Sequence, residues 1–365
     1  MKVAVAGGGV FGLSAACELA GRGHAVVVYE DDRNLPGMRA ASRDVSKALR
    51  HEYGSETALY APWVSRAREL WFDLERESGR RIFHPAGFLS ITSAPFEPGS
   101  FECDSFRVLS ELGLPVQYWS ADEGRERFPG FNLEGVRALT YNPDGGWLDP
   151  VEAIRALAAR AENRGARIER GRRLENPRAQ GADAVLLANG VWLDRFVTEL
   201  EIPLRATRQY EGFFRPENPV QAESRPIPVW SWDVASRGFY GFPLHPKDGV
   251  FKAACHLPGP RVDAEDGRGP DREAHAAVDR FVRERLEGIG PAEEGRCCFY
   301  ANSPDGRFVI DAWPGKDGVF IAGCGSGHAF KFGPLLGEWA ADSVEGRGAP
   351  EPFLWTAERR GHEPD

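Results

Sequence analysis

The sequence predicts an α/β fold of two domains, one built from alternating strands and helices and the other a β-rich α+β domain. Its 365 residues are enough for two domains. Strand–helix–strand patterns occur at the beginning, in the middle and at the end of the chain, and strand-rich segments lie between them. Both domains are therefore expected to be discontinuous, with residues 1–80, 141–204 and 300–365 in the first and residues 81–140 and 205–299 in the second.

The chain opens with the pattern of a nucleotide-binding unit. "KVAVAG" is typical of a buried strand, "VFGLSAACELAGRG" of a helix rich in small residues, and "AVVVYE" of a second strand that ends in Glu30. Between the first strand and the helix, Gly7, Gly9 and Gly12 have GxGxxG spacing. Such glycines permit a tight turn, a close approach to a pyrophosphate and close helix packing, and the acid can accept from ribose hydroxyls. The unit predicts a Rossmann-like dinucleotide site without distinguishing NAD from FAD.

Two amphipathic helices are expected further along the chain. One covers about 62–77 with Pro62 at its start, and its apolar face comprises Val64, Ala67, Leu70, Trp71 and Leu74. In the other, "DPVEAIRALAARAENRG", Asp149 is the expected N-cap, Pro150 takes the first helical position and Glu152 completes a capping box. The remaining elements are a buried strand over 182–190 that ends at Gly190, aromatic-rich strands within 205–256, a charged helix over 271–287 and a last helix from about Phe330.

Charge and composition exclude several classes of partner. Lys and Arg number 45 against 54 Asp and Glu, a net charge of −9 with no basic run, which argues against nucleic acid and anionic membranes. No window approaches the about 18 apolar residues of a membrane span. The glycine-rich N-terminus with Glu18 is unlike a signal peptide, and the six cysteines form no CxxC pair. A cytoplasmic, reducing location is expected.

Segments in the second half of the chain carry a resemblance to a known family. "RCCFYANSPDGRFVID" and "VFIAGCGSGHAFKFGP" resemble the C-terminal signature of the monomeric sarcosine oxidase and N-methyltryptophan oxidase family, within the D-amino-acid-oxidase superfamily of flavoenzymes. "DAVLLANGVW", "SKALRHEYG", "YGFP" and "FKAACH" extend the similarity in the same order from residue 2 to about residue 340. The resemblance implies an FAD-binding domain of the glutathione-reductase or D-amino-acid-oxidase type, and a monomer.

The same resemblance suggests a use for the adjacent cysteines of "RCCFY". In the family a cysteine in C-x-Y is joined covalently to the flavin, which corresponds to Cys298 with Tyr300. Alternate residues of a strand share a face, so Cys298 and Tyr300 would both face the flavin while Cys297 faces away. Nearby cations such as Lys331 would lower the thiol pKa. The alternative is that both cysteines are buried small hydrophobic residues.

The resemblance also implies two sets of site residues. The cofactor set is Gly7, Gly9, Val10, Phe11, Gly12, Glu30, Asp31, Ser42, Arg43, Ser46, Lys47, Leu174, Gly190, Cys298, Gly325, Gly327, His328, Phe330 and Lys331. The catalytic set is Lys47, Arg50, Tyr240, Lys252, His256, Tyr300 and Lys331. No metal ligand spacing is found.

Each catalytic role is implied by a match to the family pattern. Arg50 and Lys331 match a pair that holds the substrate carboxylate, and Lys331 would also stabilise reduced flavin. Lys252 matches a lysine that promotes the reaction of reduced flavin with oxygen, because a fixed cation stabilises developing negative charge. Tyr240 and His256 match residues that orient the substrate, although ordinary hydrogen-bonded core residues would also fit. Packing and chemistry explain His328 equally well, and Lys331 could be a surface lysine.

Lys47 departs from the sarcosine oxidase pattern, which has an arginine there. "SRDVSKALRHEYG" is closer to the fructosyl amino acid oxidases (amadoriases) and saccharopine-type oxidases, and a lysine lacks the bidentate fork of an arginine. Sarcosine is therefore not favoured over a bulkier N-substituted amino acid.

The implied function is FAD-dependent oxidation of the C–N bond of a secondary amine or N-substituted amino acid to an imine, with O2 reduced to H2O2. An amadoriase-type deglycating oxidase is one alternative. Others are a flavin dehydrogenase that passes electrons to a quinone or carrier protein, a fold kept as a binding module without turnover, and a nicotinamide dehydrogenase. The last is disfavoured because a second GxGxxG is missing.

Overall fold

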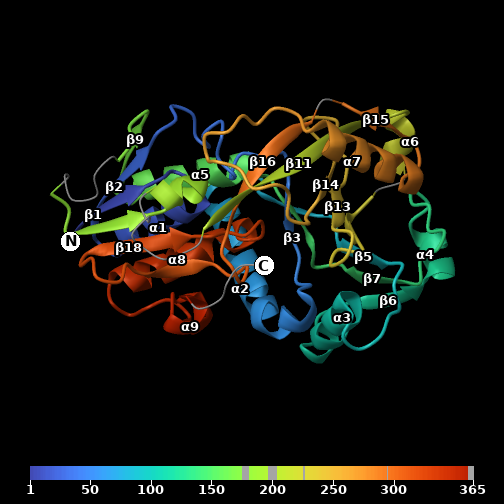
Figure 1. Cartoon of the computed structure of the whole chain (residues 1–365), viewed down its shortest axis with the longest axis horizontal. Helices are drawn as coiled ribbons and strands as arrows, with labels where there is room; N and C mark the ends of the chain where they lie inside the picture. The colour runs from blue at the N-terminus through green and yellow to red at the C-terminus, as the bar shows by residue number, and fades with distance from the viewer. Residues whose placement is uncertain (175–180, 196–203, 225–226, 294, 361–365) are drawn as a thin grey trace.

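A computed structural model describes residues 1–174, 181–195, 204–224, 227–293 and 295–360. In this part of the chain two large sheets stand at opposite ends of the molecule (Figure 1). The first has six strands in the order β17 (Val309–Ala312), β18 (Val319–Gly323), β10 (Ala184–Leu187), β1 (Lys2–Ala6), β2 (Ala25–Glu30) and β9 (Arg167–Arg170). Its strands range from blue to red in Figure 1, so distant parts of the chain build one sheet. Five strands are parallel, and β17 alone runs antiparallel to its neighbour.

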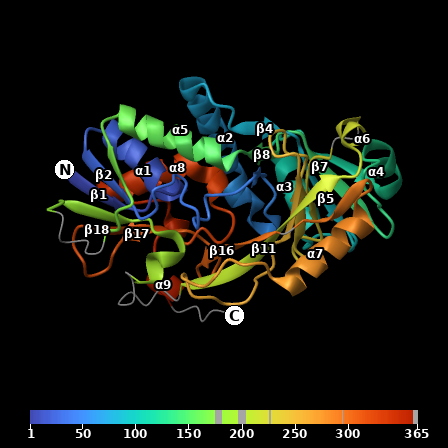
Figure 2. The same ribbon diagram turned by 90° about the horizontal axis from the view of Figure 1, so that it is seen from above.

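Helices α1 (Val10–Gly21), α5 (Pro150–Asn163) and α8 (Gly333–Val344) lie together against this sheet (Figure 2). Alternation along the strands explains the arrangement, because Val3 and Val5 join the core under the helices whereas Ala4 and Ala6 join a separate core on the other face. Small residues let the helices approach closely. A Cβ on Gly337 of α8 would lie 2.3 Å from the Ser14 carbonyl oxygen of α1.

The second large sheet is mostly antiparallel. Its order is β15 (Ile289–Ala292), β11 (Arg205–Pro216), β14 (Phe251–Cys255), β13 (Phe239–Phe242), β12 (Val229–Trp232), β5 (Phe88–Thr92), β7 (Ala138–Asn142) and β6 (Gln117–Ser120), with β16 (Arg296–Asn302) also paired to β11. Helix α7 (Arg272–Arg285) packs Phe281 on Trp230, Trp232 and Phe239 of this sheet. Three shorter helices belong to the same end of the molecule: α3 (Phe101–Glu111), α4 (Ala121–Arg127) and α6 (Pro219–Ser224).

A small third sheet and one long helix connect the two ends. The small sheet has the order β3 (Lys47–Leu49), β8 (Gly146–Leu148), β4 (Phe83–Pro85). Helix α2 (Thr57–Ser78) contributes to the core beneath α1 and α8, and a short helix α9 (Ala357–Arg360) ends the described chain. None of the described helices is both long and apolar enough to cross a membrane. The domain boundaries remain a prediction, which the membership of the two large sheets supports.

Two sequence expectations about helix starts were wrong. Helix α2 begins at Thr57, and Pro62 lies inside it rather than at its start. The turn Gly54–Glu56 precedes the helix, and Pro62 removes only the single hydrogen bond that its own N–H would donate. Asp149 does cap α5 by accepting from the N–H groups of Val151 and Glu152. The capping box fails because the Asp149 N–H is donated to the Ile82 carbonyl oxygen at 2.8 Å, while the Glu152 carboxylate pairs with Arg80 at 2.6 Å.

Other expected elements were confirmed with small shifts. The buried strand within 182–190 is β10, and the chain turns at Gly190 into a 3-10 helix. The charged helix is α7, capped by Asp271. The last helix, α8, follows a 3-10 turn over Phe330–Phe332. On α2, Val64, Ala67, Trp71 and Leu74 are fully buried and Leu70 is partly buried, as the apolar face requires.

Candidate active site

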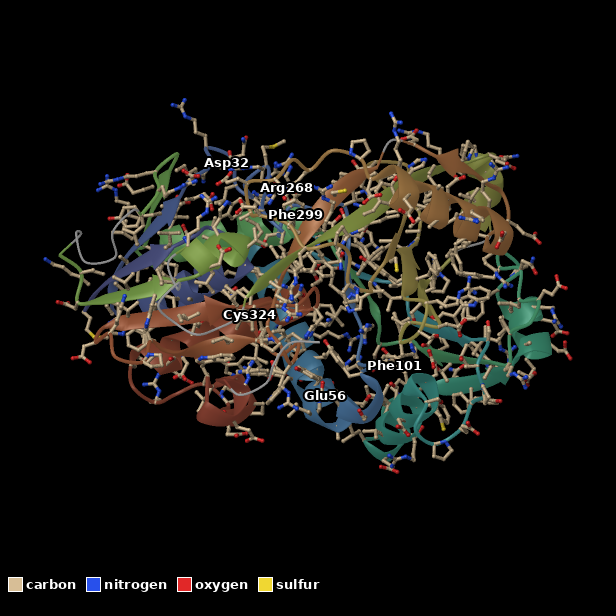
Figure 3. All side chains as sticks on the ribbon, in the orientation of Figure 1. Asp32, Glu56, Phe101, Arg268, Phe299 and Cys324 are labelled. Carbon is tan, nitrogen blue, oxygen red and sulfur yellow. The ribbon has the colours of Figure 1, made fainter. Side chains whose placement is uncertain are left out.

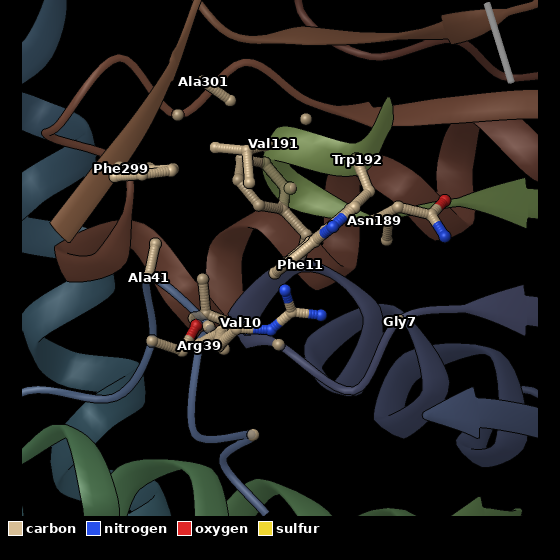
Figure 4. Close-up of a pocket in the computed structure, with 18 of the residues that line it drawn as sticks. Gly7, Val10, Phe11, Arg39, Ala41, Asn189, Val191, Trp192, Phe299 and Ala301 are labelled. Atoms are coloured by element: carbon tan, nitrogen blue, oxygen red, sulfur yellow. The ribbon is translucent and has the colours of Figure 1, made fainter. Parts of the chain in front are cut away.

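A large cavity of about 820 Å³ opens at the carboxyl ends of the parallel strands. The loops after β1, β2, β10 and β18 line it, which is where open α/β sheets bind their ligands. Strand β16 of the second sheet closes the opposite side. Figure 4 shows Val10 and Phe11 of α1 on one side, and Phe299 and Ala301 of β16 on the other. Phe299 of β16 and Cys324, which follows β18, lie near the middle of the molecule (Figure 3).

The glycine loop has the local geometry that GxGxxG predicts. Gly7 has a positive φ of 106°, and a Cβ there would lie 2.5 Å from the Ala188 carbonyl oxygen. A Cβ on Gly12 would lie 2.0 Å from the Gly7 carbonyl oxygen, so Gly12 serves packing and does not line the cavity. Gly9 precedes α1 without a capping side chain. The start of the helix therefore faces the cavity with little more than backbone.

Polar groups around the loop suit a dinucleotide. The Glu30 carboxylate accepts from the N–H groups of Gly8 at 2.7 Å and Asp32 at 2.9 Å, and it lines the cavity. Burial raises the pKa of Glu30 despite these hydrogen bonds. Ser42 Oγ accepts from the N–H of Val10 at 3.1 Å. The buried Oδ1 of Asn189, another lining residue, has no hydrogen-bond partner among the described residues. An unmatched acceptor beside the glycine turn at the start of α1 fits a bound FAD.

Most members of the expected cofactor set line this cavity: Gly7, Gly9, Val10, Phe11, Glu30, Asp31, Ser42, Lys47, Leu174, Gly190, Cys298, Gly325, Gly327 and Phe330. Ser46, His328 and Lys331 line a second cavity instead, and Gly12 and Arg43 line neither. Sequence reasoning missed Arg39, Asn189 and Trp192. Asn189 follows a buried strand directly, a position that could have indicated it. Arg39 stacks on Trp192 at 5.3 Å, a contact between segments far apart in the sequence.

The second cavity is much smaller, about 70 Å³, and all seven residues of the expected catalytic set line it. Six of them come from β3, β13, β14, β16 and the segments next to these strands, and Lys331 comes from the 3-10 turn before α8. Lys47, Tyr300, Gly327 and Phe330 line both cavities, so the two are neighbours. Apolar side chains complete the wall: Ala48, Phe88, Val229, Trp230, Val234, Phe242 and Phe330.

Two cations face this cavity without a carboxylate at ion-pair distance in the described structure. Arg50 lies over the Tyr53 ring at 4.8 Å, and its buried Nη1 has no hydrogen-bond partner among the described residues. Lys331 is 4% exposed and donates to the Tyr53 hydroxyl and the His328 carbonyl, both at 2.8 Å. Burial and the charge of Arg50 hold the pKa of Lys331 well below its ordinary value. Such a pair can bind an anion.

Neutral polar groups occupy the other side of the cavity. Burial and the charges of Arg50 and Lys331 lower the pKa of His256 to about 4, so its imidazole is neutral near pH 7. The hydroxyls of Tyr240 and Tyr300 share a hydrogen bond, and burial raises the pKa of both. His328 lies between the Tyr53 hydroxyl at 3.3 Å and the Gly306 carbonyl at 3.0 Å. A neutral ring between two such partners is held in one orientation.

Sequence reasoning also missed a buried ionic cluster beside the junction of the cavities. We use this name for Asp44, Lys47, Glu211, Lys252 and Arg296. Asp44 Oδ2 accepts from Lys252 at 2.5 Å and Lys47 at 2.7 Å, and Asp44 Oδ1 from Arg296 at 3.0 Å. Glu211 pairs with Lys252 at 3.0 Å and Arg296 at 2.6 Å.

The cluster assembles through strand pairing that is distant in sequence. Glu211 of β11 lies directly opposite Arg296 of β16 and Ala254 of β14. Arg296 could have been found, because it precedes Cys298 by two positions on one strand and so shares its face. Burial alone would raise the pKa of the Asp44 carboxyl. The cations Lys252, Lys47 and Arg296 outweigh that effect and hold this pKa well below its ordinary value.

The two adjacent cysteines have different surroundings. Cys298 lines the large cavity, whereas Cys297 does not line it and belongs to the buried core of the second sheet. Burial raises the pKa of the Cys298 thiol, and Lys47 and Arg296 oppose that rise. The expectation that Lys331 lowers this pKa was wrong, because Lys331 faces the small cavity. All six cysteines are free thiols, and no group of His, Cys, Asp and Glu in the described ranges could hold a metal ion.

Comparison with known proteins agrees with this architecture. Monomeric sarcosine oxidase from Bacillus sp. (strain B-0618) is 29% identical over 357 residues, which cover 92% of this chain and 90% of that protein. N-methyl-L-tryptophan oxidase from Salmonella heidelberg (strain SL476) is 28% identical over 338 residues, 88% of either chain. The structure of Amadoriase I, a fructosyl amine:oxygen oxidoreductase from Aspergillus fumigatus, superposes with a TM-score of 0.79 at 20% identity, over 98% of this chain and 90% of that one. The family described as FAD dependent oxidoreductase (DAO) matches residues 2–343, and the chain belongs to this family of FAD-dependent oxidoreductases.

Proposed function

We propose that the protein oxidises the C–N bond of a small secondary amine that carries a carboxylate, giving an imine. The observation that carries this proposal is the pair Arg50 and Lys331 beside a cavity that adjoins the FAD site. A buried guanidinium nitrogen without a partner in the described structure, next to an ammonium group, is a site prepared for an anion. The relatives named for sarcosine and N-methyl-L-tryptophan support an N-methyl amino acid as substrate.

The size and polarity of the small cavity limit the substrate. At about 70 Å³, with Phe88, Trp230 and Phe242 in its wall, it favours a compact N-alkyl or cyclic amino acid. A sugar-modified amino acid would bring several hydroxyls against apolar side chains, where they would lack hydrogen bonds. The cavity therefore speaks against an amadoriase-type substrate, although Lys47 stands where the sarcosine oxidase pattern has arginine.

FAD, when bound, supplies the acceptor for the hydrogen and the two electrons that leave the carbon beside the amine. Arg50 and Lys331 hold the carboxylate and so fix that carbon at the junction of the cavities. His256 is neutral and can accept a hydrogen bond from the amine N–H, which orients the amine. The apolar wall favours the neutral amine that the reaction needs, because burial disfavours the charged ammonium form. The Tyr240–Tyr300 pair borders the same position. The apolar wall excludes water from the imine while it forms.

Three finer features belong to the same proposal. Cys298 is the covalent attachment point of FAD, because it is the cysteine of C-x-Y that lines the large cavity. O2 is the electron acceptor and H2O2 the second product, in keeping with the oxidases among the relatives. The protein acts as a monomer. All three rest on the resemblance together with the placement of these residues.

The test is a substrate screen with the purified holoprotein under anaerobic conditions. Compact N-methyl and cyclic amino acids are expected to bleach the flavin absorbance, whereas the same amines without the carboxylate and sugar-modified amino acids are not. Admission of oxygen should then restore the flavin and release peroxide. Bleaching by the decarboxylated amines at equal concentration would contradict the carboxylate site. If the colour returns only with an added quinone, the electron acceptor is not O2. The proposed oxidation of the amine would stand in that case.

A further inference from the structure

The ammonium group of Lys252 is fully committed within the buried ionic cluster. Its three N–H groups are donated to Asp44 Oδ2 at 2.5 Å, Glu211 Oε1 at 3.0 Å and the Ser46 carbonyl at 3.2 Å. An ammonium group has only three donors. The Lys252 side chain is 1% exposed, and two carboxylates neutralise its charge. This environment argues against the oxygen-directed role that the resemblance implies for Lys252.

Lys47 has a different environment in the same cluster. Its only ion-pair or hydrogen-bond partner among the described residues is Asp44, at 2.7 Å, so two of its three donors are open. Its side chain is 19% exposed against 1% for Lys252. Of all cations in the described structure, Lys47 alone lines both cavities. The ammonium group available where the FAD cavity meets the substrate cavity is that of Lys47.

The buried ionic cluster has more positive than negative charges, and Lys47 belongs to it. Three cations, Lys47, Lys252 and Arg296, face two carboxylates, so the cluster carries one net positive charge. Arg296 donates from Nε to Glu211 and from Nη2 to Asp44 and the Arg43 carbonyl, and it lines neither cavity. Burial opposes the charged form of Lys47, but Asp44 outweighs it and raises the pKa of Lys47, which therefore stays protonated. The cation of the cluster that faces both cavities is therefore Lys47.

We propose that Lys47, and not Lys252, is the cation that promotes the reaction of oxygen in this protein, and that Lys252 is a structural counter-ion for Asp44 and Glu211. The proposal rests on the proposed function. Overall, two electrons and two protons leave the H–C–N–H unit of the amine to give the imine, and one O2 takes them up to form H2O2. The first electron that O2 receives makes it anionic, and a fixed ammonium group with open donors stabilises that charge.

A comparison of Lys47→Met with Lys252→Met in the holoprotein distinguishes the roles of the two lysines. After anaerobic reduction by substrate, the return of flavin absorbance on mixing with oxygen is followed by stopped flow. Lys47→Met is expected to slow this step by about 10²-fold, the usual loss for one fixed donor aimed at developing charge, and to slow reduction by substrate much less. Lys47→Arg keeps the charge and should recover most of the rate. Lys252→Met should slow the oxygen step less than Lys47→Met does.

Thermal unfolding provides a readout independent of turnover. Lys252→Met leaves Asp44 and Glu211 without their shared cation and is expected to lower the Tm of the protein by several degrees more than Lys47→Met does. If Lys252→Met does not fold, Lys252→Arg takes its place, with an oxygen step close to the wild-type rate. A wild-type oxygen step in Lys47→Met, or a larger loss in Lys252→Met, would overturn the proposal. If no amine bleaches the wild-type flavin, the proposed function itself fails, which is a distinct result.

Discussion

The Lys331 ammonium group donates a hydrogen bond of 2.8 Å to the hydroxyl of Tyr53, whose ring stacks on Tyr60 with centroids 4.3 Å apart. Since Lys331 also donates to the His328 carbonyl, two of its donors are fixed by protein atoms and one is left for a ligand. Both phenol pKa values are raised by burial, so neither tyrosine can neutralise the ammonium group as a phenolate near pH 7. The proposed carboxylate position of the small cavity is thus organised before substrate binds.

Carboxylate binding should take up a proton at pH values between the pKa of Lys331 in the free protein and its pKa in the complex. Burial and Arg50 lower the pKa of Lys331 in the free protein, and a bound carboxylate would raise it again by favouring the charged form. Affinity is then highest below the pKa of the free protein. It falls by up to about tenfold per pH unit as the pH rises through the interval between the free and bound values. Titration with propionate, which has no amine, followed by the change in the flavin spectrum, measures this dependence. Calorimetry in two buffers of different ionisation enthalpy counts the proton.

The matched variant for this test is Lys331→Met. It removes the titrating group, so proton uptake and the slope with pH should both disappear while some affinity remains through Arg50. A pH-independent dissociation constant for propionate in the wild-type protein, from neutral pH to the ordinary lysine range, would show that Lys331 is not part of the anion site.

Arg50→Ala should weaken binding of a carboxylate substrate by about 10²-fold, because loss of one partner from a desolvated charge pair typically costs a few kcal/mol. Flavin content should stay near normal, since Arg50 lines the small cavity and not the large one. The measurement is KM for the amine substrate, together with flavin per chain. Arg76→Ala is the control, because Arg76 is an exposed arginine at the end of α2 that pairs with Asp73. Equal KM values in the two variants would show that Arg50 does not bind the substrate carboxylate.

The glycine loop was predictable from sequence because its requirements are local. Gly7 is required by its positive φ, and Gly12 by the Gly7 carbonyl oxygen that a Cβ would contact within the βαβ unit, and the GxGxxG spacing encodes both directly. Arg50, Tyr240 and Lys252 have no such local signature. They lie on separate strands or loops, and only the resemblance to a family placed them together.

Neither the spacing of motifs nor the resemblance to a family predicted the ionic cluster. Glu211 meets Arg296 and Lys252 through pairing of β11 with β16 and β14, and such registers are set by the whole sheet. The failed capping box has the same origin, since the groups that would form it pair with Ile82 and Arg80, both far away in sequence. Charges that find partners across distant segments cannot be read from spacing along one segment.

Gly12→Ala should impair FAD binding and stability together. Its Cβ would lie 2.0 Å from the Gly7 carbonyl oxygen and 3.2 Å from Val5 Cγ1, and the nearer atom is backbone that can move only with the loop. Strain of this kind typically costs about 1–3 kcal/mol or more. We expect a lower Tm and less flavin per chain after purification. Gly269→Ala is a suitable control, because a Cβ there meets no atom within 4 Å. Normal flavin content in Gly12→Ala would mean that the loop can shift without affecting the site.

If FAD is attached through Cys298 as proposed, the wild-type protein should keep its flavin through acid precipitation and Cys298→Ala should release it. Cys298 lines the FAD cavity, whereas Cys297 packs in the core of the second sheet, so only one of the two neighbours can reach the cofactor. The sulfur must react as a thiolate, and Lys47 and Arg296 oppose the rise that burial causes in its pKa. The yellow colour should therefore move to the supernatant for Cys298→Ala and stay in the pellet for Cys297→Ala, which only loses a buried side chain. Release of all flavin by the wild-type protein would rule out the covalent link and leave non-covalent FAD. If Cys297→Ala is the only variant that releases flavin, Cys297 is the attached residue. That result would contradict the placement of both side chains in the structure.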